Sequence, residues 1–146
     1  MPRLFMLVVL GIAVLSTICE AESKRIHVTA RVVQTTYTGN PASPQLGDLR
    51  VTNVDLLDES GITIGTGAGV CTVVTVPPLD ALDECLITAV FVEGHIIFGG
   101  LAQSPELGVT GRFGILGGTD GFREARGQAT LVVTSAEFQD ATFDID

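Results

Sequence analysis

Along most of this chain, hydrophobic residues alternate with polar ones or cluster with β-branched neighbours in short segments. In residues 24–36, for example, Ile26, Val28, Ala30 and Val32 recur at every second position, which places them on one face of a strand. Glycine, proline, asparagine and aspartate mark turns between such segments, and almost no run has helical periodicity. The pattern predicts about eight strands, at residues 24–36, 48–58, 62–76, 84–92, 95–102, 108–116, 126–134 and 138–145.

Strands at this regular spacing predict one antiparallel, all-β domain. An up-and-down barrel and a sandwich both fit the pattern. An eight-stranded barrel would have no free edges and an interior wide enough for one small ligand.

The first 21 residues have the pattern of a secretory signal peptide. Arg3 supplies the positive start, residues 4–18 are predominantly apolar, and Ala21 is a small residue suited to cleavage. We therefore expect residues 22–146 to form the mature domain, secreted or periplasmic. An uncleaved anchor is the alternative, whereas the bulky Ile18 argues against lipid attachment at Cys19.

The net charge of −9 at pH 7 makes nucleic acid and anionic membranes poor partners, because both repel an acidic domain. Removing residues 1–21 leaves this charge unchanged, because one arginine and one glutamate are lost together. The Gly-x-Gly-x-Gly run at residues 65–69 lies in a strand pattern with no following helix, so a nucleotide site is not expected.

Cys71 and Cys85 are the two cysteines of the mature chain. An even pair in an exported protein indicates a disulfide, and this one would close a loop of about 15 residues. The alternative is a reactive thiol at Cys71, for which no partner base is evident. No metal-binding pattern is present, so we expect neither a metal nor a cofactor.

Three segments carry a resemblance to a known family: LGDLRVTN at residues 46–53, DLLDESGITIG running on to GAGVC at residues 55–71, and GGTDGFREARG at residues 117–127. Together they resemble the allene oxide cyclase and dirigent superfamily, which includes the barrel cyclases that close spirotetronate polyketides. The resemblance implies a single eight-stranded antiparallel up-and-down β-barrel with an apolar cavity open at one end. It also implies chemistry that depends on substrate orientation and requires no metal or nucleotide.

The resemblance also points to site residues on the segment 48–58. Asn53 matches the asparagine that helps to hold the catalytic water in plant allene oxide cyclases. The two-residue period of a strand would place Val51 and Asp55 on the same face as Asn53. We therefore predict Asn53 and Asp55 as catalytic residues and Val51 as a substrate contact. The alternative for Asp55 is a carboxylate at the rim or paired with an arginine.

Two further residues are predicted to contact substrate. Tyr37, the only tyrosine, begins a proline-containing loop that would cap the barrel mouth. Arg112 would donate hydrogen bonds to a substrate oxygen, or alternatively anchor backbone carbonyls beside the glycine-rich turn. Thr35 and Tyr37 stand where the plant enzymes have a glutamate and an asparagine, so we do not expect plant-type allene oxide cyclase activity.

These observations favour a cofactor-free cyclase or isomerase. It would orient a lipophilic polyketide- or fatty-acid-derived substrate for stereoselective ring closure, such as a [4+2] cycloaddition. The alternative is a non-catalytic, secreted, dirigent-like protein that binds a hydrophobic small molecule or steers stereoselective coupling. A secreted barrel with a filled interior is a third hypothesis. The oligomeric state, including a homo-oligomer, stays open.

Overall fold

The computed structural model describes residues 23–76, 81–103 and 107–146. The predicted signal peptide, residues 1–21, lies outside this range. The strands are β1 (Lys24–Tyr37), β2 (Leu49–Leu57), β3 (Thr63–Thr75), β4 (Leu82–Phe91), β5 (Gly94–Gln103), β6 (Thr110–Gly118), β7 (Gly127–Val133) and β8 (Phe138–Ile145). A single 3-10 turn, η1 (Asp120–Phe122), lies between β6 and β7.

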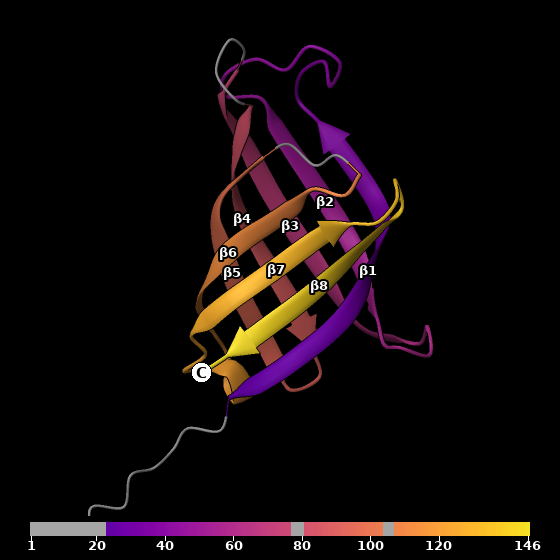
Figure 1. The fold of residues 1–146 in the computed structure, drawn as a ribbon, viewed down its shortest axis with the longest axis vertical. Helices are drawn as coiled ribbons and strands as arrows, with labels where there is room; N and C mark the ends of the chain where they lie inside the picture. Colours follow the sequence, from indigo (N-terminus) through magenta and orange to yellow (C-terminus); the bar gives the residue numbers. More distant parts are fainter. Residues whose placement is uncertain (1–22, 77–80, 104–106) are drawn as a thin grey trace, which may run out of the picture.

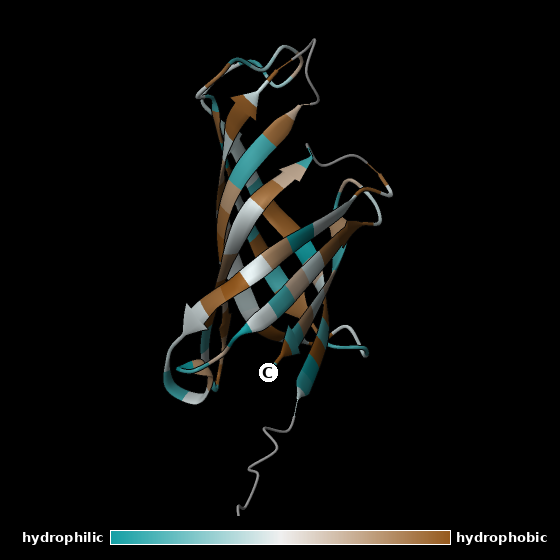
Figure 2. Ribbon diagram, turned by 60° about the vertical axis from the view of Figure 1, so that its left-hand side comes forward, coloured by the Kyte–Doolittle hydropathy of each residue, from teal (hydrophilic) through white to brown (hydrophobic). Residues whose placement is uncertain are grey.

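Each strand pairs antiparallel with the next, and β8 pairs with β1, so the sheet closes into a barrel (Figure 1). This closure confirms the predicted eight-stranded up-and-down barrel and excludes the sandwich. Hydrophobic and hydrophilic positions alternate along the strands (Figure 2), as expected when one face of each strand points into the barrel. The face of β1 that was predicted to carry Val28 and Ala30 points into the barrel, where both residues are buried.

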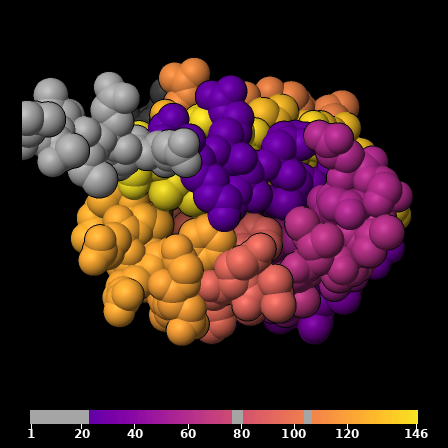
Figure 3. Space-filling model, turned by 90° about the horizontal axis from the view of Figure 1, so that it is seen from below, coloured from indigo at the N-terminus to yellow at the C-terminus, as the bar shows by residue number. Residues whose placement is uncertain are grey.

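One end of the barrel is filled with aromatic side chains. The rings of Phe91 and Phe122 lie 5.9 Å apart between centroids, and Phe143 is 6.1 Å from Phe91 and 5.2 Å from Phe98. Tilted and edge-on ring pairs of this kind add stabilisation beyond the burial of their area. In the view from this end, the orange atoms of residues 119–126 lie beside those of the β4–β5 turn, and no open channel is visible between them (Figure 3).

The glycine-rich segment 117–127 closes this end. The backbone N–H groups of Thr119 and Gly121 donate to the carbonyls of His95 and Glu93, at 3.0 and 2.9 Å. A side chain at Gly118 would collide with the backbone carbonyl of His95, so only glycine allows this close approach. The segment thereby inserts Phe122, which is 4 % exposed, into the barrel end. Its function in the fold is to close the barrel.

Candidate functional site

A cavity of about 250 Å³ occupies the other half of the barrel, toward the end that carries the loop of residues 38–48. Inward-facing side chains of all eight strands line it, and most of them are aliphatic, small or aromatic. Those from β1, β2 and β4 include Val32, Val54, Ile87 and Ala89, and those from β6, β7 and β8 include Phe113, Leu131 and Ala141. Phe98 and Phe143 form its floor, where the aromatic cluster begins.

Two glycines on β3 leave room for side chains of the neighbouring strands in the wall of the cavity. Gly67 and Gly69 face inward and line the cavity. A Cβ atom at Gly67 would lie 2.8 Å from Cγ2 of Val54, and one at Gly69 would lie 3.1 Å from Cγ1 of Ile87. The glycines therefore allow the side chains of β2 and β4 to lean across β3. This is the structural use of the Gly-x-Gly-x-Gly run.

Polar groups in the cavity concentrate toward its open end. Arg50 is the only charged residue among the described residues that line it. Its Nη2 lies 3.0 Å from Oδ2 of Asp83, whose side chain is 4 % exposed, while that of Arg50 is 18 % exposed. A buried carboxylate requires such a partner, because an unpaired charge there would be strongly destabilising.

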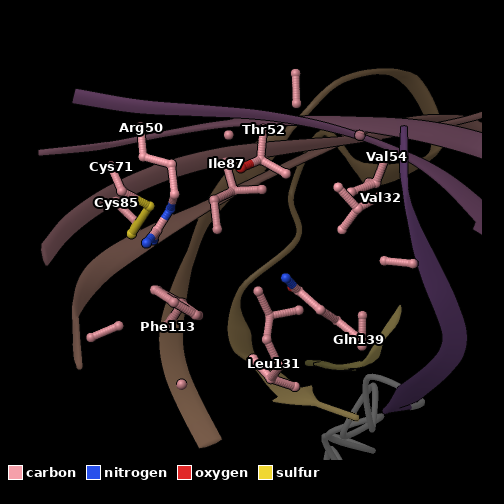
Figure 4. A pocket seen from close by; sticks show the side chains of 18 of the residues that line it. Val32, Arg50, Thr52, Val54, Cys71, Cys85, Ile87, Phe113, Leu131 and Gln139 are labelled. Atoms are coloured by element: carbon pink, nitrogen blue, oxygen red, sulfur yellow. A yellow bond between two sulfur atoms is a disulfide. The ribbon is translucent and has the colours of Figure 1, made fainter. Parts of the chain in front are cut away.

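The pair Cys71–Cys85 forms a disulfide, as predicted from the cysteine count. The two residues are direct partners on β3 and β4, and both line the cavity. Figure 4 shows the side chain of Arg50 extending beside this disulfide into the cavity. The disulfide therefore fixes two neighbouring strands at the position of the only charged group of the wall within the described ranges.

Tyr37 lies at the mouth, at the end of β1, with Arg50 as its direct partner on β2. Both residues also line a second, outer hollow of about 240 Å³, formed with residues of the loop 38–48 and with Asp83. Tyr37 thus lines both the cavity and the outer hollow, and its contact with substrate stays a prediction. A β-bulge between Val32 and Gln34 is the reason that Tyr37 faces inward, because the extra residue reverses the alternation of β1.

The predicted inward face of β2 is wrong. Asn53 is exposed and Asp55 forms an ion pair with Arg31, 2.7 Å between Nη2 and Oδ2, on the outer surface. The inward positions of β2 are instead Arg50, Thr52, Val54 and Leu56. Since neighbouring residues of a strand point to opposite faces, an error of one residue turns the whole set outward. Val51 faces outward with Asn53 and Asp55.

The prediction for Arg112 needs the same correction, because this side chain is exposed and its neighbours Gly111 and Phe113 line the cavity. Sequence reasoning missed Arg50 and Thr52. The match of Asn53 to an asparagine of the plant enzymes had indicated the opposite face. The alternation of the strand could not have found them, because Val51 lies on one face and Val54 on the other.

Elsewhere, no group of three or more histidine, cysteine, aspartate or glutamate side chains suitable for a metal ion occurs among residues 23–76, 81–103 and 107–146. Over the same described ranges, no helix is long and apolar enough to cross a membrane.

A family model described as "Allene oxide cyclase barrel like domain" matches residues 26–143. Among solved structures, a pyocyanin demethylase superposes with a TM-score of 0.73 at 18% identity, covering 84% of this chain and 100% of that one. AbnU, an exo-specific intermolecular Diels-Alderase, gives 0.68 at 19% identity over 84% and 98%. The Diels-Alderase AbmU from Streptomyces koyangensis gives 0.65 at 16% identity over 87% and 71%. No curated protein matches this chain. At these identities the similar structures establish the fold.

Proposed function

Since the chain belongs to the family of allene oxide cyclase barrel-like domains, we propose that it is a cyclase that folds a lipophilic, linear substrate inside the barrel for stereoselective ring closure. The observation that carries this proposal is the half-filled barrel. Its aromatic end closes one side of a cavity of about 250 Å³ whose wall is mostly hydrocarbon. The similar fold of two Diels-Alderases, one of them intermolecular, supports a [4+2] reaction as the class we propose.

The proposed reaction is a [4+2] ring closure between a conjugated diene and an alkene of one substrate. Two carbon–carbon σ bonds and one π bond form from three π bonds, and no atom or electron leaves. Such a reaction gains most from holding the two partners in one geometry, an effect worth up to about 7–11 kcal/mol in well-oriented systems. The inward residues Phe113, Ile87 and Leu131 offer apolar surfaces from three strands for that purpose.

The test is to incubate residues 22–146 with a linear polyene that carries a diene and an activated alkene, and to measure the rate and the stereoisomers formed. We expect one stereoisomer, formed faster than in buffer. Leu131→Trp fills the cavity from β7 and should abolish the acceleration. Thr130→Trp, on the outer face of the same strand, is the matched control and should retain it.

Binding of the polyene without acceleration would favour the alternative, a non-catalytic dirigent-like protein that holds a hydrophobic small molecule. Failure of the chain to bind it would contradict both proposals. We also propose that the protein is exported after cleavage behind Ala21, because residues 1–21 have the pattern of a signal peptide. Mass spectrometry of the secreted or periplasmic protein should then give a chain that begins at Glu22.

A further inference from the structure

Arg50 reaches its position in the cavity by crossing a strand. It faces inward from β2, in register with Cys71 on β3, which is in turn in register with Cys85 on β4. The arginine side chain extends beside this disulfide (Figure 4), and its Nη2 lies 3.0 Å from Oδ2 of Asp83 on β4. The guanidinium is therefore held at one place between the inner cavity and the outer hollow.

Asp83 both fixes and neutralises this guanidinium. A guanidinium has five N–H donors, and the ion pair through Nη2 leaves others for a ligand. A ligand carboxylate would bring a second negative charge beside Asp83, in a chain whose net charge is already −9. A neutral carbonyl oxygen would accept the same hydrogen bond without adding a charge. The pair therefore favours a neutral acceptor over an anion.

We propose that the ligand carries a neutral, conjugated carbonyl group whose oxygen accepts a hydrogen bond from Arg50. The hydrocarbon part of the ligand extends from there toward Phe113 and Phe98. This inference rests on the proposed cyclase function and names its substrate class. Donation to the carbonyl oxygen draws electron density from the conjugated alkene, so the alkene reacts more readily with an electron-rich diene. Asp83 is a positioning residue that acts through Arg50.

Three naphthalene probes of nearly equal size separate these possibilities: 2-acetylnaphthalene, 2-naphthoate and 2-ethylnaphthalene. Their dissociation constants are measured by calorimetric titration of residues 22–146. The infrared carbonyl stretch of bound 2-acetylnaphthalene reports hydrogen bonding to its oxygen. We expect the wild type to bind the ketone more tightly than the carboxylate, with the carbonyl stretch lowered from its value in hexane.

Variants assign the effect to the pair. Arg50→Met should weaken ketone binding about tenfold, as expected for one hydrogen bond from a charged donor. It should raise the carbonyl stretch and leave 2-ethylnaphthalene within twofold. If the variant does not fold because Asp83 loses the opposite charge of Arg50, R50M/D83N replaces it, since this double variant removes both charges of the pair. Arg112→Met, which removes an arginine from the outer surface, is the matched control and should change nothing.

The sharpest readout is Asp83→Asn. It leaves the charge of Arg50 uncompensated, so the order of affinities should reverse and 2-naphthoate should bind more tightly than the ketone. A purely structural role of Asp83 would weaken all three probes together, and that result would overturn its positioning role. Tighter binding of 2-naphthoate by the wild type, or an equal carbonyl stretch in wild type and R50M, would overturn the inference while leaving the cyclase proposal intact. If the wild type binds none of the probes, the cyclase proposal fails as well.

Discussion

Replacing Phe122 by alanine should destabilise the barrel without altering the cavity. The side chain of Phe122 is 4 % exposed, and the centroid of its ring lies 5.9 Å from that of Phe91. The ammonium of Lys24 lies 5.0 Å from the same centroid. Truncating a buried phenylalanine costs about 3–5 kcal/mol, because the transfer energy is lost and a cavity remains. For a domain of this size, that loss lowers the melting temperature by roughly 10–20 °C.

Thermal and urea unfolding followed by circular dichroism would measure this change. Val92→Ala is the matched control, because Val92 lies in the turn at the same end of the barrel and is 94% exposed. Its melting temperature should stay within about 2 °C of the wild type. The affinity of the folded F122A variant for 2-ethylnaphthalene should be unchanged below its melting transition, since Phe122 does not line the cavity.

Two results would refute this reasoning. A loss smaller than about 1 kcal/mol would mean that Phe122 does not fill the end of the barrel as its burial indicates. An affinity reduced tenfold in the folded variant would mean that the segment 117–127 belongs to the ligand site. In that case its role would not be limited to closing the barrel.

Three further outcomes follow from the structure. The C71S/C85S variant should lose about 3 kcal/mol in urea unfolding, because the disulfide closes a loop of about 15 residues; no loss in unfolding free energy would contradict this. The hydrogen bond from the Ser60 hydroxyl, the largest of several causes, holds the pKa of the Asp58 carboxyl below its usual value, so the ionised carboxylate stabilises the fold above the unfolded pKa and this stabilisation is lost as the pH falls through the folded pKa. An NMR titration that gives Asp58 a pKa at or above that of a free aspartate would contradict this expectation. Gly67→Val should weaken probe binding in the same titration, because its Cβ would lie 2.8 Å from a β2 methyl carbon; unchanged affinity would show that the wall can yield.

Much of the fold was predictable because its causes are local. Alternation at residues 24–36 and 138–145 is a property of each strand, and the structure places both strands within one residue of those bounds. The pairing of Cys71 with Cys85 followed from their being the two cysteines of the mature chain. The resemblance over the segments 46–71 and 117–127 is confirmed by the family match to residues 26–143.

The candidate site depended on contacts that no local pattern contains. Both faces of β2 mix apolar and polar residues, Val51 with Asn53 on one and Arg50 with Val54 on the other, so its periodicity is equally consistent with either orientation. Only pairing with β1, shifted by the bulge after Val32, determines which face points inward. The tyrosine at the mouth faces the interior for the same reason.

The sequence by itself determined the strands, because alternation and turn residues are local features of the chain. It also determined the disulfide, because the mature chain has two cysteines, and the family, because three segments carry the resemblance. Only the closed barrel determined where the cavity lies and that the charged group in its wall belongs to Arg50. Arg50 meets Asp83 only because β2, β3 and β4 are held side by side, with the Cys71–Cys85 disulfide between them. That contact spans 33 positions of the chain, and it exists because barrel closure sets the register of every strand.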